Sequence, residues 1–187
     1  MRIENITKTF DGKTVLDNLN MEILEGRITC IMAPSGAGKT TLLRILMGLE
    51  RADSGRITGF LQKRFSAVFQ EERLCEQMSA VKNIRLVTPG LDTKMVGKEL
   101  ARLGLGADGT QPVSELSGGM RRRVSILRAL LAPYDVLFLD EPFKGLDQEL
   151  KVQVMAYVRE KTAGKTVVVV THDRQEALAL GAAVIEL

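Results

Sequence analysis

The chain has 187 residues, enough for one sizeable hydrophobic core or for a core with a small additional lobe. Its net charge of +3 gives no support for a nucleic-acid-binding protein, and its 45% hydrophobic and 26% charged residues are ordinary for a soluble globular protein. The amino terminus has no signal-peptide pattern, and no apolar run reaches the roughly 18 residues that a membrane-spanning helix needs. We therefore expect a cytosolic chain, with Cys30 and Cys75 as free thiols, that reaches a membrane only through a partner.

The first two predicted elements form an antiparallel hairpin. Residues 1–10 have the apolar positions of a strand, Asp11-Gly12-Lys13 is a turn signal, and residues 15–24 continue as a second strand region. Phe10 lies at the turn. Two interpretations stay open for it: a core side chain, or an aromatic ring that stacks on a base.

A glycine-rich loop, residues 33–41, follows the apolar residues 28–32 and precedes an amphipathic helix over residues 42–49. Its glycines let backbone N–H groups turn inward as an anion cradle at the start of the helix. Lys39 suits the β- and γ-phosphates of a nucleotide, and the Thr40 hydroxyl suits Mg²⁺.

Ala33 stands where a P-loop usually opens with glycine. We expect this to be tolerated, because a residue before proline favours an extended backbone. The alternative is a plain glycine turn.

The composition changes after the next two predicted strands, residues 57–60 and 66–69, the second of which ends at Gln70. Helical apolar spacing follows in two segments, residues 81–87 and 95–103. We expect residues 70 to about 115 to form a separate small helical lobe.

A serine and two glycines open the helix that continues to Leu131. Ser117 suits the N-cap, and Gly118 and Gly119 leave the helix N-terminus accessible to an anion. The run Arg121-Arg122-Arg123 follows. Taken alone, it favours a solvated helix face over an anion site.

Two unbroken apolar runs predict buried strands. Residues 136–139 end in Asp140-Glu141-Pro142, and residues 167–170 end in Thr171-His172-Asp173. The remaining predicted elements are helices over residues 148–161 and 174–180 and a last strand over residues 183–187. Strands that alternate with helices indicate a mostly parallel sheet covered on both faces.

Ligands of such sheets bind beyond the carboxyl ends of the strands, so the glycine loop, Gln70, Asp140-Glu141 and His172 should converge on one crevice. Asp140 suits a Mg²⁺ position reached through water, and Glu141 could polarise the water that attacks a γ-phosphate. We expect His172, the only histidine, to contact the γ-phosphate, and Gln70 to contact Mg²⁺. The alternatives are that Asp140 only terminates a strand and that His172 is an ordinary surface or core residue.

Together these motifs resemble the nucleotide-binding domain of an ATP-binding cassette (ABC) transporter. The resemblance implies an α/β fold: a P-loop NTPase (RecA-like) core with a mostly parallel sheet, an N-terminal antiparallel β layer and a small helical subdomain. We expect one domain over residues 1–187, with the core at residues 1–69 and 116–187. The matched motifs are Walker A (33–41), the Q-loop (Gln70), the signature (116–120), Walker B with its glutamate (136–141), the D-loop (145–147) and the switch histidine (His172).

The resemblance also assigns roles to matched residues. It implies catalytic roles for Glu141, His172, Gln70 and Lys39, and it implies that Thr40, Gln70 and Asp140 hold Mg²⁺. It further implies a head-to-tail dimer with two ATP molecules at the interface, each completed by Ser117, Gly118 and Gly119 of the other subunit. The residues expected to contact ATP from within one chain are Phe10, Val15, Ser35, Gly36, Ala37, Gly38, Lys39, Thr40, Thr41 and Asp147.

The partners implied are a second nucleotide-binding subunit, as a homodimer, membrane permease subunits and a substrate-binding protein, with no nucleic acid. The chain would be cytoplasmic and peripheral on the inner face of the cell membrane through the permease. Residues 71–74 and 120–123 look most like the nitrate, sulfonate and taurine importer group, from which residues 75–77 depart.

The predicted function is ATP hydrolysis that energises a small-solute importer through ATP-driven dimer closure. The alternative is a soluble ABC-type ATPase that acts on nucleic acid, ribosomes or cluster assembly.

Overall fold

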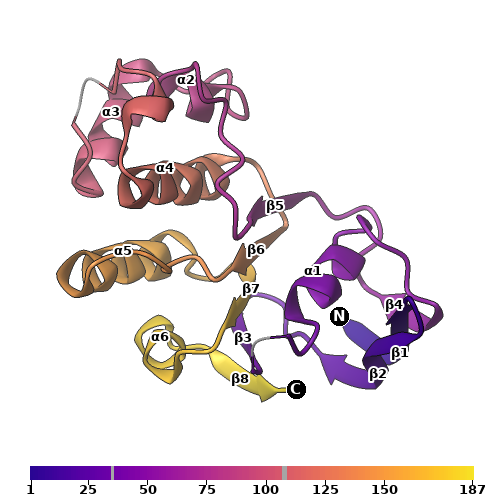
Figure 1. Cartoon of the computed structure of the whole chain (residues 1–187). Coiled ribbons are helices and arrows are strands. Elements are labelled where there is room, and N and C mark those ends of the chain that lie inside the picture. The colour runs from indigo at the N-terminus through magenta and orange to yellow at the C-terminus, as the bar shows by residue number, and fades with distance from the viewer. Residues whose placement is uncertain (35, 107–108) are drawn as a thin grey trace.

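A parallel sheet forms the centre of the computed structural model, which describes residues 1–34, 36–106 and 109–187 (Figure 1). Its strands are β3 (Ile28–Met32), β5 (Phe65–Val68), β6 (Val136–Asp140), β7 (Thr166–Thr171) and β8 (Ala183–Glu186). Within the described residues they lie in the order β5-β6-β7-β3-β8, and all neighbours are parallel. The predicted parallel sheet is confirmed.

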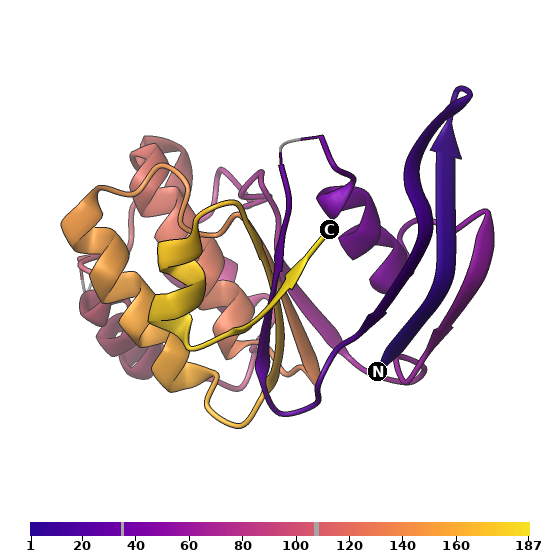
Figure 2. The ribbon, with the colours of Figure 1, turned by 90° about the horizontal axis from the view of Figure 1, so that it is seen from below.

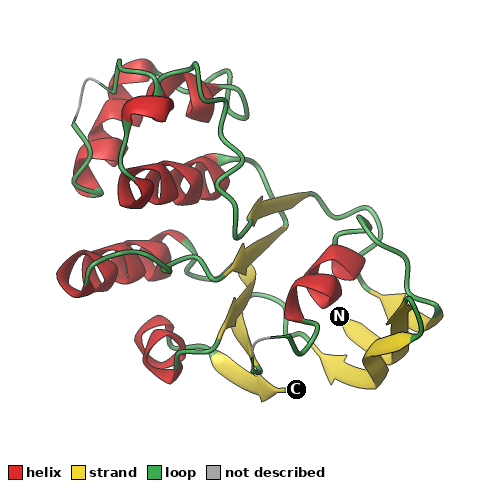
Figure 3. Cartoon of the chain, in the orientation of Figure 1, coloured by secondary structure: helices red, strands yellow, loops and turns green. Residues whose placement is uncertain are grey.

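Both faces of this sheet are buried at β6 and β7, where every residue is buried although successive side chains point to opposite faces. Leu137 and Leu139 of β6 pack into one apolar cluster, whereas Phe138 packs into another. Helices lie on both sides of the sheet (Figure 3). Helices α4 (Gly118–Leu131), α5 (Gln148–Lys161) and α6 (Arg174–Leu180) lie on one side, and α1 (Lys39–Leu46) lies on the other (Figure 1).

A second, antiparallel sheet lies beyond α1, so that α1 is held between the two sheets (Figure 2). In the described part of the chain its order is β2-β1-β4, from β1 (Arg2–Phe10), β2 (Lys13–Glu22) and β4 (Ser54–Thr58). The predicted hairpin is confirmed. The strand expected at residues 57–60 begins and ends earlier, because its backbone pairs with β1, where Ile57 lies opposite Ile3.

The helical lobe contains α2 (Ala80–Arg85), α3 (Thr93–Arg102) and the short 3₁₀ helix η1 (Val113–Glu115). Both predicted helical segments are present, shifted by one or two residues. Ile84 and Leu100 of the lobe belong to the same buried cluster as Leu137 of β6, so the lobe and the core share apolar contacts. A division of the chain at about residues 70 and 115 therefore remains our proposal. The described ranges contain no helix of the length and apolar character needed to cross a bilayer.

Candidate functional site

A polar cleft of about 420 Å³ opens at the carboxyl ends of the parallel strands. The structure brings together four features that are far apart in the sequence: the glycine loop after β3, Gln70 after β5, Glu141 after β6 and His172 after β7. This is the convergence that the strand-end argument predicts. The lining residues are Val15, Gly36, Gly38, Lys39, Thr40, Thr41, Gln70, Glu141, Lys144 and His172.

The glycine loop is shaped by two left-handed residues. Gly36 and Gly38 each have a φ of +83°, a conformation that favours glycine. Gly38 is also the N-cap of α1, and within the described residues no side chain caps the first N–H groups of this helix. Uncapped N–H groups at a helix N-terminus form a ready anion site. Ser35, which was expected to contact ATP, lies outside the described residues.

Lys39 spans the base of the loop. Its ammonium group donates hydrogen bonds to the carbonyl oxygens of Ala33 at 2.7 Å and Pro34 at 2.8 Å, and the residue is only 6% exposed. An ammonium carries three N–H donors, so one remains for a ligand above the loop. The contact uses the carbonyl oxygen of Ala33, and the tolerance of alanine at this position stays a prediction.

Thr40 and Asp140 are joined across the bottom of the cleft. The Thr40 hydroxyl donates to Oδ2 of Asp140 at 2.9 Å, and Nε2 of Gln70 lies 3.4 Å from the same hydroxyl. Burial, the largest contribution, raises the pKa of Asp140, and the neighbouring Glu141 carboxylate acts in the same direction. Among the described residues, Oδ1 of Asp140 has no hydrogen-bond partner.

This arrangement fits a divalent cation that takes part of its ligands from a bound phosphate. Hydroxyl and carboxylate oxygens are the ligands that Mg²⁺ prefers, and Mg²⁺ in nucleotide sites is held by few protein groups. In the described part of the chain, no group of three or more His, Cys, Asp or Glu side chains could hold a metal by itself. Thr40, Asp140 and Gln70 would therefore hold a cation only together with a phosphate.

Glu141 faces His172 across the cleft mouth. Its Oε1 lies 3.3 Å from Nδ1 of His172, and its Oε2 lies 3.9 Å from Nζ of Lys144. Glu141 is a non-glycine residue with a φ of +45°, a backbone strain of the kind that occurs at functional sites. Its N–H donates to the carbonyl oxygen of Val170 in β7 at 2.9 Å, so two strands fix its position. Lys144 is not among the site residues that the sequence predicts, because a single lysine outside the recognised motifs forms no pattern.

Ser117, Gly118 and Gly119 lie at the start of α4 and do not line the cleft. Figure 1 shows the start of α4 and the start of α1 on opposite sides of the parallel sheet. As expected, Ser117 is the N-cap, and its hydroxyl oxygen accepts a hydrogen bond from the Met120 N–H at 3.3 Å. Ser117 and Gly118 are exposed, so a ligand outside this chain can reach them.

Three other expected ATP contacts are also absent from the cleft lining: Phe10, Ala37 and Asp147. Phe10 is 41% exposed at the end of β1, with Nζ of Lys8 at 4.8 Å from the ring centroid. Its interpretation as a core side chain is therefore wrong. Asp147 caps α5, where its carboxylate accepts a hydrogen bond from the Leu150 N–H at 2.9 Å.

The favoured interpretation of the arginine run as a solvated face is wrong for two of its three residues. Arg122 is 4% and Arg123 is 8% exposed, and burial lowers the pKa of both. The Arg122 guanidinium donates to the carbonyl oxygens of Phe69 at 2.5 Å and Gln70 at 2.6 Å, which ties α4 to the segment that carries Gln70. The run itself was visible in the sequence, but these carbonyl partners, more than 50 residues away, were not.

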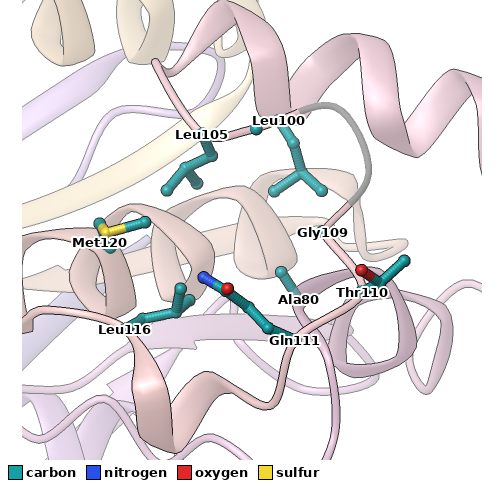
Figure 4. Close-up of a pocket in the computed structure, with 9 residues that line it drawn as sticks. Ala80, Leu100, Leu105, Gly109, Thr110, Gln111, Leu116 and Met120 are labelled. Carbon is teal, nitrogen blue, oxygen red and sulfur yellow. The ribbon is translucent and has the colours of Figure 1, made fainter.

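A second cavity, of about 250 Å³, lies in the helical lobe (Figure 4). Leu100 and Leu105 line it on one side, and Leu116 and Met120 line it near the start of α4. None of the residues that line the polar cleft lines this cavity, so the two are separate.

The loop between β3 and α1 and the acidic end of β6 define a P-loop nucleoside triphosphatase fold. A family model described as ABC transporter matches residues 16–144, more than half of the chain. The chain belongs to the ABC transporter family.

Several known proteins are similar to this chain along most of its length. The Fe(3+) ions import ATP-binding protein FbpC of Brucella abortus is 38% identical over 202 residues, which cover 97% of this chain and 56% of the relative. The aliphatic sulfonates import ATP-binding protein SsuB 1 of Streptomyces avermitilis is 36% identical, covering 96% of this chain and 70% of the relative. The chain thus spans a little more than half the length of the FbpC relative.

A solved structure agrees with these similarities. The ABC transporter cassette MJ0796, solved as a dimer, has a TM-score of 0.84 and 28% identity, covering 100% of this chain and 93% of the cassette. The relatives are import subunits for iron, sulfate, sulfonate and polyamines at 34–38% identity, so they do not single out the predicted nitrate, sulfonate and taurine group. That finer grouping stays a prediction.

Proposed function

We propose that this chain binds and hydrolyses ATP and thereby energises a membrane transporter that imports a small solute. The observation that carries the proposal is the single cleft in which Lys39, Thr40, Gln70, Glu141 and His172 come together. Family membership and the names of the similar proteins, all import ATP-binding subunits, support the transport role. The cassette MJ0796 has also been solved after hydrolysis, with ADP and phosphate bound.

Each residue of the cleft has a proposed task. The N–H groups of the glycine loop and Lys39 bind the phosphates, and Thr40, Asp140 and Gln70 hold Mg²⁺. When bound, this ion neutralises phosphate charge. Glu141 takes up a proton from the attacking water, and His172 holds the γ-phosphate in line with that water. Phosphoryl transfer depends mostly on such positioning and charge stabilisation.

The exposed Ser117-Gly118-Gly119 stretch serves the cleft of a second copy. Within one chain this stretch does not line the cleft, whereas a head-to-tail homodimer would present its N–H groups to the γ-phosphate of the partner site. The dimeric state of MJ0796 supports this arrangement. Phe10 and Val15 take the adenine side, and Asp147 remains a proposed ATP contact.

The further partners are permease subunits and a substrate-binding protein, with no nucleic acid. The chain is then cytoplasmic and held at the inner face of the cell membrane by the permease. Co-purification in mild detergent from the native cell tests these partners. A stoichiometric polytopic membrane protein is expected, and ribosomes, nucleic acid or soluble assembly proteins in its place would contradict the transport role.

Glu141→Gln tests the chemistry. The substitution removes the base but keeps the size of the side chain, so hydrolysis should fall by about 10²–10⁴-fold while ATP binding is retained. The variant should also accumulate as an ATP-bound dimer, measured by light scattering. Glu22→Gln, on the exposed end of β2, is the matched control and should keep wild-type turnover. Wild-type hydrolysis by Glu141→Gln would remove Glu141 as the base.

A further inference from the structure

Lys151, on α5, is a largely buried lysine that pairs with two carboxylates beside His172. Its ammonium lies 2.7 Å from Oδ2 of Asp173 and 2.6 Å from Oε1 of Glu176, and its side chain is 16% exposed. The Glu176 side chain is 6% exposed. None of the functional motifs includes Lys151, and the cleft lining does not include it.

The two carboxylates are in turn bonded to the backbone and side chains that flank His172. The Thr171 hydroxyl donates to Oε2 of Glu176 at 2.5 Å, and the Asp173 N–H donates to the Thr171 hydroxyl at 3.1 Å. Oδ1 of Asp173 accepts from the Gln175 N–H at 2.8 Å and so caps α6. Both chain neighbours of His172 thus belong to one bonded cluster that includes Lys151.

His172 itself has little to hold it. Its side chain is 62% exposed, and its hydrogen-bonding contact among the described residues is Glu141 at 3.3 Å. The direction of the imidazole is therefore set by the backbone between Thr171 and Asp173. Whatever fixes those two residues fixes the position of Nδ1 relative to Glu141.

Lys151 supplies the positive charge that both carboxylates of the cluster share. Burial acts to lower the pKa of Lys151, but hydrogen bonds to Asp173 and Glu176 outweigh it, and the net pKa is raised. The hydrogen bond from Lys151 is the largest cause that lowers the pKa of Asp173. Without the ammonium, two carboxylates would share a partly buried site without a counter-charge, which is costly, so the segment would have to rearrange.

We propose that Lys151 is a positioning residue for His172: it holds the segment 171–173 against α5 so that the imidazole stays within reach of Glu141 and of the γ-phosphate. The proposal rests on the proposed role of His172 in the nucleotide site. It predicts a loss of turnover rather than of ATP binding, because the phosphate-binding loop lies on other elements.

The test uses Lys151→Met in the full chain, with Lys151→Arg as the conservative variant. Lys161→Met is the matched control, since Lys161 lies on the same helix and pairs with a largely buried carboxylate, Glu99, at 2.8 Å. A displacement on the order of 1 Å can cost about 10²-fold, so kcat of Lys151→Met should fall by about 10–100-fold with little change in KM for ATP. Lys151→Arg should recover most of the lost kcat, and Lys161→Met should keep the wild-type value.

A second measurement follows His172 directly. The chain has one histidine, so an untagged, histidine-labelled sample gives the NMR signals of a single imidazole. These signals should shift in Lys151→Met, return towards the wild-type position in Lys151→Arg and stay unchanged in Lys161→Met.

The two measurements separate the possible failures. Unchanged imidazole signals in Lys151→Met, or equal kcat in Lys151→Met and Lys161→Met, would overturn the proposal. If wild-type turnover did not depend on His172, as tested with His172→Ala, the proposed role of His172 in the nucleotide site would fail, while the NMR comparison would still decide whether Lys151 positions the imidazole.

Discussion

Replacing Gly38 by alanine should destabilise the protein more than replacing Gly36, although both glycines have a φ of +83°. The difference lies in what a new Cβ meets. At Gly36 a new Cβ would meet nothing within 4 Å among the described residues, whereas at Gly38 it would be 2.8 Å from the carbonyl oxygen of Val15 and 2.8 Å from Cδ2 of Leu16. Strand β2 thus packs directly on the phosphate-binding loop.

The size of the effect can be worked out from these contacts. A left-handed alanine costs about 1–2 kcal/mol relative to glycine, and this cost is shared by both variants. Crowding against a packed element adds about 1–3 kcal/mol, and this cost applies only at Gly38. For a domain of this size each kcal/mol lowers Tm by about 2–4 °C, so Gly38→Ala should melt about 2–12 °C below Gly36→Ala.

The assay is thermal unfolding by circular dichroism without nucleotide, followed by calorimetric titration with ATP. Gly38→Ala should also bind ATP more weakly than Gly36→Ala, because either β2 or the start of α1 must move to make room. Equal Tm values for the two variants would refute the argument that β2 restrains the loop. A lower Tm for Gly36→Ala would show that backbone strain, and not packing, dominates there.

Three further outcomes are expected. Lys39→Ala should weaken ATP binding about 10–100-fold in calorimetric titrations, since a hydrogen bond to a charged group contributes about 1.5–3 kcal/mol; unchanged affinity would contradict the P-loop assignment. Ser117→Arg should abolish hydrolysis but leave ATP binding by the monomer intact, because Ser117 lies outside its own cleft; surviving activity would exclude the action in trans. Hydrogen bonds from Arg64 lower the pKa of Asp135 from 3.8 to about 2, so this carboxylate stabilises the fold above about pH 4 and loses that effect as the pH falls towards 2. The Tm advantage of the wild type over Asp135→Asn should shrink over that range, and a constant difference in Tm would contradict the ion pair.

Local signals in the sequence were sufficient for most elements. Helix α5 covers the predicted residues 148–161, because its N-cap Asp147 and its apolar spacing are encoded within a few residues. The unbroken apolar runs of β6 and β7 predicted buried parallel strands for the same reason. The strand ends then predicted which polar residues share the cleft, since parallel strands end at one edge of the sheet.

Other features depend on partners that are distant in the sequence. Arg122 looked solvent-exposed within its own run, yet it binds the carbonyl oxygen of Gln70, 52 residues away. Phe10 could be core or surface by its strand pattern, and its place at the end of β1, next to the hairpin turn, leaves its side chain exposed. Lys151 belongs to no motif. Its two ion pairs form only because the fold brings α5 next to Asp173 and Glu176.

The sequence by itself thus determined the elements and the order of the chemical groups along the chain, because capping, periodicity and glycine turns act between near neighbours. Only the tertiary structure decided which buried charges are paired, which expected contacts lie outside the cleft and which side chains hold His172 in place. Those outcomes depend on burial and on hydrogen-bond partners that are brought together by packing, and no local pattern encodes them.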